Sequence, residues 1–220
     1  RPPGWKPPDS GPGIAVAERH EYAPREMMRT PAFYLLWTAF LLGSGVGLMI
    51  ISQASPIGQE MAGLSPIVAG GAVTILAIFN GLGRPTFGAI SDRIGRKNAL
   101  FLAFAITIVA LVLVLPNARS FAVYALGVSL IGFSYGGFLA LMPALTADYY
   151  GTRNVGLNYA WVYCAWGAAG VLGPMVGVHV GAADGGWLKA FYLLAGACVL
   201  GIVLTAFIKP PPATLAAGSK

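Results

Sequence analysis

Residues 80–97 read NGLGRPTFGAISDRIGRK and lie between two long apolar runs. This stretch places Arg84 inside a segment that is apolar and long enough to be a membrane helix. Eight residues later follows a short charged loop, which carries Asp92, Arg93, Arg96 and Lys97. A charge inside the hydrocarbon core of a bilayer costs about 2.5 kcal/mol or more. Arg84 is therefore a candidate functional residue, and the charged loop beside it indicates what kind of membrane protein carries it.

The composition assigns the chain to the membrane proteins. Of its 220 residues, 56% are hydrophobic and 10% are charged, and the mean hydropathy is +0.70. Soluble domains carry about 25% charged residues. The formal net charge of +6 comes from loops between apolar runs, which argues against binding to nucleic acid. The two cysteines and two histidines show no spacing typical of a metal site, so we expect neither a metal nor a cofactor.

Six stretches can cross a bilayer, since a spanning helix needs about 20 mostly apolar residues. They cover approximately residues 33–55, 67–90, 99–116, 121–147, 154–180 and 188–208. We therefore predict an all-α membrane protein with a six-helix bundle over residues 33–208. Residues 1–32, which contain the proline-rich RPPGWKPP, form a predicted linker, and residues 209–220 form a predicted tail.

The basic residues gather on one side of these predicted spans. Of the fourteen Lys and Arg residues, eleven fall on the side that holds both chain ends: Arg1, Lys6, Arg19, Arg25, Arg29, Arg93, Arg96, Lys97, Arg153, Lys209 and Lys220. Arg119 and Lys189 fall on the other side, and Arg84 lies within a span. Because short loops rich in Lys and Arg stay in the cytoplasm, we predict a multi-pass protein of the cell membrane with both ends cytoplasmic.

Glycine and proline follow two patterns within the spans. Gly-x-x-x-Gly pairs, which favour close helix packing, occur at residues 132/136 and 173/177. Gly/Pro clusters at residues 81–85 and 173–174 fall in the second and fifth spans. These two spans correspond if the six helices are two sets of three, and interrupted helices at matching places point to a transport site.

A short motif occurs twice on the predicted cytoplasmic side. Residues 92–98 and 148–154 both read Asp-x-x-Gly-x-(Lys/Arg)-Asn. In one interpretation the acids and bases of the two motifs pair across helix ends. In the other, the motifs share only their turn chemistry, since Asp, Gly and Asn all favour turns. The sequence leaves both interpretations open.

The charged loop resembles the signature loop of the major facilitator superfamily. Residues 88–97 match its pattern Gly-x-x-x-Asp-Arg-x-Gly-Arg-Arg/Lys, which joins helices 2 and 3 and again helices 8 and 9. The whole chain resembles helices 7–12, the C-terminal half of a twelve-helix transporter, preceded by its central loop. We therefore expect an N-terminal six-helix half as its partner, together with the lipid bilayer. The predicted gating residues are Gly88, Asp92, Arg93, Gly95, Arg96, Lys97, Asp148 and Arg153.

Within that superfamily, the chain is most similar to the oxalate/formate antiporter family and the related monocarboxylate transporters. The likeness is carried by PPGWKPP in the linker, by NGLGRPTFG from Asn80, and by PALTADYYG from Pro143. In oxalate antiporters, an arginine of helix 8 and a lysine of helix 11 hold the two carboxylates. Arg84 matches the arginine, whereas Trp166 stands where the lysine would be. Asn80 stands where proton-coupled monocarboxylate transporters have an Asp, so this position carries no proton.

The candidate substrate-binding residues are Arg84, Asn80, Tyr135, Phe138, Tyr163 and Trp166. The Arg84 guanidinium can fork onto a carboxylate, although it could instead extend to the membrane surface or pair with an acid of the other half. Asn80 lies one turn away on the same helix face. The resemblance implies an aromatic cage around a small carboxylate, while packing or lipid contact is the alternative role for the aromatic residues.

These expectations define a non-enzymatic protein without catalytic residues. The predicted function is secondary transport of a small monocarboxylate-like anion by alternating access, with Arg84 pairing with the carboxylate. Two alternatives stay open at this point. One is oxalate/formate-type exchange of a dicarboxylate, and the other is transport of a different small solute with Arg84 in a structural role.

Overall fold

The computed structural model describes residues 21–183 and 186–211 and confirms the all-α prediction. Its long helices are α2 (Pro31–Ala62), α3 (Pro66–Ile94), α4 (Arg96–Val109), α5 (Phe121–Tyr150), α6 (Val155–Val176) and α7 (Trp187–Phe207). The shorter elements are the helix α1 (Pro24–Met27), the π-helical turns η1 (Ala110–Val114) and η3 (Gly177–Gly181), and the 3₁₀ turn η2 (Leu115–Asn117). With these turns included, six helices in the described residues are long and apolar enough to cross a membrane.

The helix ends follow from local sequence chemistry. Thr30, Ser65 and Ser120 precede α2, α3 and α5, and each side-chain oxygen accepts a hydrogen bond from the amide three residues later. Gly63 and Gly95 end α2 and α3 with φ values of 63° and 87°, a region that glycine adopts without strain. These signals place α2 two residues earlier than the sequence predicts and extend α3 by four residues beyond the predicted span.

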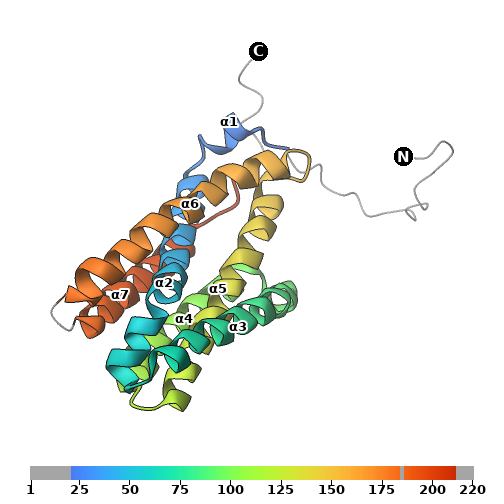
Figure 1. Ribbon diagram of the computed structural model, residues 1–220. Helices are drawn as coiled ribbons and strands as arrows, with labels where there is room; N and C mark the ends of the chain where they lie inside the picture. Colours follow the sequence, from blue (N-terminus) through green and yellow to red (C-terminus); the bar gives the residue numbers. More distant parts are fainter. Residues whose placement is uncertain (1–20, 184–185, 212–220) are drawn as a thin grey trace.

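Two helices form the centre of the bundle and two flank it. In the most apolar window of each helix, 67% of residues are buried in α5 and 56% in α2, against 28% in α6 and 22% in α3. α3 packs along α5, and α6 packs along α2, while α4 and α7 contact each other on a further side (Figure 1). α3 and α6 therefore keep long apolar faces that no described helix covers.

The close contact between α3 and α5 depends on glycine. A side chain at Gly132 would overlap the carbonyl oxygen of Leu76, and one at Gly136 would overlap that of Asn80. On the other side of the bundle, a side chain at Gly173 would overlap the carbonyl oxygen of Gly45 in α2. The predicted Gly-x-x-x-Gly pairs thus lie at helix–helix contacts, where small residues allow the two backbones to approach.

The expected interruption of the second span is wrong. α3 runs as one helix through residues 81–85, including Pro85. Gly83 lies in this stretch and packs directly against the backbone of Phe133, so α5 supports the helix where Pro85 removes a hydrogen bond. In α6 the helix also passes Pro174, and it changes to π-helical geometry only at Gly177.

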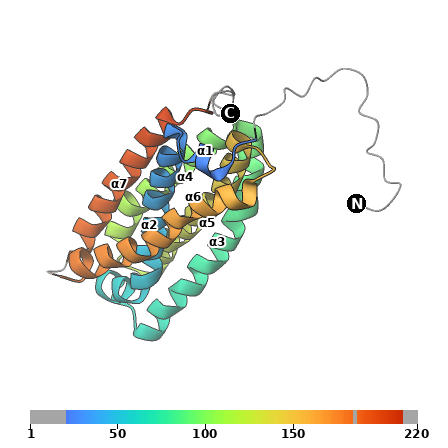
Figure 2. The same cartoon turned by 90° about the horizontal axis from the view of Figure 1, so that it is seen from above.

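Both ends of the described chain lie at one end of the bundle, together with the α3–α4 and α5–α6 turns (Figure 2). We call this the charged end. Residues 21–30, the last part of the predicted linker, pack against it. The Tyr22 amide donates to the Tyr150 carbonyl at 3.0 Å, and the Tyr22 carbonyl accepts from the side-chain amides of Asn154 and Asn158, each at 3.0 Å. The first twenty residues, with RPPGWKPP, lie outside the described residues.

Candidate functional site

Arg84 lies on the uncovered face of α3, one turn from Asn80. Its Nε donates to Asn80 Oδ1 at 3.3 Å, so the two side chains do share one helix face. Within residues 21–183 and 186–211, no carboxylate forms an ion pair with Arg84. The guanidinium therefore has a neutral neighbour on one nitrogen and no anionic partner in the described part of the chain.

Tyr135 lies where four helices meet. Its ring, from α5, lies over Gly47 of α2, where any side chain would overlap it. The next residue, Gly136, touches the α3 backbone between Asn80 and Arg84. From α6, the Trp166 indole Nε1–H donates to the Tyr135 hydroxyl at 2.6 Å. Tyr135 is 4% exposed, so packing on all sides fixes its ring.

The aromatic residues of α6 form a row beside this tyrosine. The rings of Tyr163 and Trp166 are stacked, with centroids 5.1 Å apart and planes 14° from parallel. Tyr159 continues the row, with its centroid 5.5 Å from that of Tyr163. Gly136, next to Tyr135, touches the α3 backbone from Asn80 to Arg84. This helix contact brings the α3 turn of Asn80 and Arg84 beside Tyr135 of α5, which in turn bonds Trp166 of α6.

The sequence analysis did not identify Tyr159. The signal was present, since residues 159, 163 and 166 have the i, i+4, i+7 spacing of one helix face. A helix as apolar as α6 shows no contrast between its faces, so the spacing alone did not identify the face that meets Arg84.

Phe138 lies apart from the other candidate residues. It is 1% exposed, and its ring packs on Phe104 of α4 with a centroid distance of 4.7 Å. A side chain at Gly43 of α2 would collide with the same ring. Phe138 is thus part of the buried core, because its ring packs between Phe104 of α4 and Gly43 of α2.

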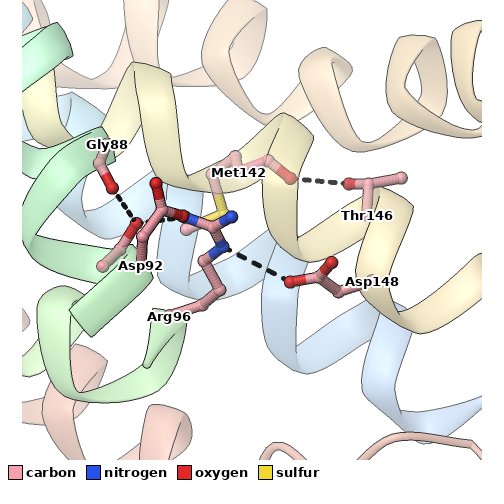
Figure 3. Close-up of polar contacts among 7 residues, drawn as sticks. Gly88, Asp92, Arg96, Met142, Thr146 and Asp148 are labelled. Carbon is pink, nitrogen blue, oxygen red and sulfur yellow. Dashed lines mark hydrogen bonds and ion pairs between the residues drawn. The ribbon is translucent and has the colours of Figure 1, made fainter. Parts of the chain in front are cut away.

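A second cluster at the charged end joins three helices (Figure 3). Arg96 forms ion pairs with Asp92 at 2.7 Å and with Asp148 at 3.3 Å, and it also donates to Ser91 Oγ. Asp92 lies in the last turn of α3, Arg96 begins α4, and Asp148 lies in the last turn of α5. Asp148 of one motif copy thus pairs with Arg96 at a variable position of the other, whereas the shared basic residues Lys97 and Arg153 form no ion pair with a described residue. Gly95 and Gly151 both have positive φ, so the two copies do share their turn chemistry.

The remaining candidate gating residues have different surroundings. Lys97 Nζ donates to the carbonyls of Ala206 and Ile208 at 3.0 and 2.9 Å, which satisfies the last turn of α7. Gly88 accepts a hydrogen bond from Ser91 through its carbonyl, and no other residue fills the space where a side chain would lie. Gly95 supplies the positive φ between α3 and α4.

Arg93 and Arg153 are exposed at the charged end. Neither side chain forms an ion pair with another described residue. The backbone amide of Arg153 instead donates to the Glu21 carboxylate at 2.7 Å, which connects the α5–α6 turn to the segment before α1. In the part of the chain that the structure describes, no group of three His, Cys, Asp or Glu could hold a metal ion.

Comparison with known proteins agrees with this architecture. The family model of the Major Facilitator Superfamily matches residues 35–220. The chain is 34% identical to the oxalate:formate antiporter of Oxalobacter formigenes over 198 residues, which is 90% of this chain and 47% of that protein. It is 28% identical to the uncharacterized MFS-type transporter YhjX of Escherichia coli (strain K12) over 151 residues, which is 69% of this chain and 38% of YhjX.

A further relative is monocarboxylate transporter 14 of Mus musculus, which is 36% identical over 103 residues, or 46% of this chain and 20% of that protein. The chain thus spans about half the length, or less, of these curated relatives. The family match covers all six spanning helices, from within α2 to beyond α7. The chain therefore belongs to the Major Facilitator Superfamily.

Proposed function

We propose that this chain is the C-terminal six-helix half of a secondary transporter that moves a small monocarboxylate by alternating access. The observation that carries the proposal is Arg84, a permanent cation on the uncovered face of a membrane helix with no anionic partner among the described residues. Burying such a charge in a membrane costs free energy, so a charged residue within a span is by default a candidate functional residue. The uncovered faces of α3 and α6 are where an N-terminal half would close the cavity.

The surroundings of Arg84 suit a carboxylate. Asn80 accepts a hydrogen bond only from the Nε of Arg84, and no described residue accepts one from the two terminal nitrogens of the guanidinium. These nitrogens can form the paired hydrogen bonds by which a guanidinium holds a carboxylate. With the N-terminal half in place, Tyr135 and the aromatic row of α6 would help to exclude water, which would strengthen an ion pair. Binding then favours one state of the transporter, and no covalent step is required.

The number of cations favours one carboxylate over two. Trp166 occupies the position of the second cation of oxalate antiporters, so Arg84 is the single positive charge in this cluster. Exchange of oxalate and formate is the second candidate function, and it is favoured by 34% identity to an oxalate:formate antiporter. Phe138 takes no part in the proposed site, because it packs within the core.

The Arg96 cluster would act as the gate. It joins α3, α4 and α5 at the end that the distribution of Lys and Arg assigns to the cytoplasm. The ion pairs are partly exposed, so each contributes little stability and can break as the two halves move. In this proposal both ends of the chain are cytoplasmic, and the protein lies in the cell membrane.

Uptake of labelled formate, lactate and oxalate tests the proposal, in liposomes that hold this chain with its N-terminal half. Removing a hydrogen bond to a charged group costs about 1.5–3 kcal/mol, so Arg84→Ala should reduce formate and lactate uptake at least tenfold. Arg84→Lys should retain part of the uptake, because an ammonium keeps the charge without the fork. The matched control is Arg119→Ala in the opposite loop, and equal uptake by Arg84→Ala and this control would contradict the proposal.

A further inference from the structure

We infer that Trp166 is a positioning residue, which holds the Tyr135 hydroxyl as a hydrogen-bond donor to the carboxylate on Arg84. The inference rests on the proposed function and assigns a role to the residue that replaces the second cation. In place of a lysine, the chain has a neutral pair, with an indole on α6 that fixes a phenol on α5. The site would then recognise an anion with one cation and one neutral donor.

The direction of the hydrogen bond follows from the chemistry of the two groups. An indole N–H is only a donor, so the Tyr135 oxygen is the acceptor in the 2.6 Å contact with Trp166 Nε1. A phenol that accepts this bond still has its own O–H to donate. Among the described residues, no oxygen or nitrogen accepts a hydrogen bond from the Tyr135 hydroxyl. A buried hydroxyl of this kind is expected to find a partner, and the partner we assign is the substrate.

The position of Tyr135 limits what the hydroxyl can reach. Its ring is held over Gly47, and the adjacent Gly136 presses against the α3 backbone at Arg84. Trp166 is held in turn by its stack on Tyr163. Tyr135 therefore lies on the turn of α5 that touches the α3 backbone from Asn80 to Arg84, and in this inference a carboxylate on the guanidinium lies within reach of its hydroxyl. Because the Tyr135 ring is already fixed, binding of the substrate loses little conformational entropy of this side chain.

This arrangement also defines the substrate class. One carboxylate is neutralised by Arg84 and accepts a further hydrogen bond from Tyr135. A second carboxylate on the same molecule would face the rings of Trp166 and Tyr163 without a cation, and an unpaired charge in such surroundings is strongly disfavoured. The inference therefore specifies small monocarboxylates with an uncharged remainder.

A double-mutant cycle on formate uptake tests whether Trp166 acts on the substrate only through Tyr135. We call this arrangement the relay. The alternative is that the two residues contact the substrate independently. Tyr135→Phe removes the donor and should raise the half-saturation concentration about tenfold. Trp166→Phe keeps a ring that can stack on Tyr163 but loses the N–H, so it should raise the half-saturation concentration about threefold while the maximal rate changes less. In the Tyr135→Phe background, Trp166→Phe should have no further effect. Trp161→Phe, on the exposed face of α6, is the matched control and should behave as wild type.

The relay would be overturned if the effects of the two substitutions multiply in the double variant, or if Trp166→Phe has the half-saturation concentration of wild type. In either case, formate uptake by wild type would still uphold the proposed function. Absence of uptake of every tested carboxylate by wild type would overturn the proposed function and the relay with it.

A second measurement needs no transport. The ultraviolet resonance Raman difference between wild type and Trp166→Phe isolates the Trp166 indole. Its N–H signal should change from hydrogen-bonded to free when Tyr135→Phe is introduced, and an unchanged signal would also overturn the relay.

Discussion

At the scale of single residues, the balance of charge around Arg84 decides which anions fit. A guanidinium is a charged group in proteins, and an amide is neutral. Of the two proposed binding residues on α3, only Arg84 therefore supplies a charge. Trp166 adds a hydrogen bond to Tyr135 but no charge. In the proposed site, a neutral side chain on α6 thus stands where the resemblance to oxalate antiporters implies a second cation.

Trp166→Lys should change the substrate preference toward dianions. The introduced ammonium adds a second cation next to Tyr135, and a dicarboxylate can then be neutralised at both ends. We expect oxalate uptake to rise at least tenfold and formate uptake to fall, measured as competition between the two labelled anions. Trp166→Met, which also removes the indole but adds no charge, is the control. Equal oxalate uptake by the two variants would contradict the charge argument.

At the scale of helices, the contact between α3 and α5 places the site. Gly132 and Gly136 are one turn apart on α5 and both face the α3 backbone. This contact sets the distance from Arg84 to Tyr135, because Gly136 lies between their helices. In lipid, such packing takes the place of the hydrophobic effect that holds soluble helices together.

Gly136→Ala should therefore destabilise the protein and weaken the site. The new methyl group overlaps a backbone oxygen that cannot rotate away, and overpacking of this kind costs about 1–3 kcal/mol. Thermal unfolding in detergent should show a midpoint several degrees below that of wild type. Gly167→Ala is the matched control, since nothing lies within 4 Å of its added carbon and alanine favours the helix. A midpoint for Gly136→Ala equal to that of this control would show that the two helices can separate without cost.

At the scale of the whole molecule, the site and the candidate gate lie at different depths. Asp92 follows Arg84 by eight residues, which is about 12 Å along a helix. The Arg96 cluster therefore cannot touch a substrate on Arg84. It connects the ends of α3 and α5, the same two helices whose contact positions the site. A change at the charged end can reach the site through this helix pair.

Arg96→Ala should slow transport without weakening substrate binding. It removes both ion pairs, so the ends of α3 and α5 lose their connection through α4. We expect the maximal rate of formate uptake to fall severalfold and the half-saturation concentration to stay within about twofold. Because the side chain is 27% exposed, the effect on unfolding should be below about 1 kcal/mol.

The matched control for this variant is Arg25→Ala, which removes an exposed arginine of α1 at the same end of the bundle. A rise in half-saturation with an unchanged maximal rate would place Arg96 in binding rather than gating. Asp148→Asn should reproduce most of the effect of Arg96→Ala, since it breaks the pair that connects α4 to α5.

The membrane class, the number of spans and the family resemblance could all be predicted from the residues alone, because these depend on local composition and on one charged loop. The sequence also placed Arg84 and Asn80 on a common face, since four residues make about one helical turn. The predicted boundaries were too narrow for several spans, because capping residues set the ends of the helices.

The neighbours of the aromatic candidate residues follow from the packing of the helices and could not be predicted from the sequence. The tertiary structure joined Trp166 to Tyr135, placed Tyr159 beside Tyr163, and placed Phe138 in the core. The physical reason is that α5 and α6 are apolar on every side, so periodicity shows which residues share a face but not which neighbour that face meets. The pairing of Arg96 with Asp148 likewise depends on how the helices pack, since fifty-two residues separate them in the chain.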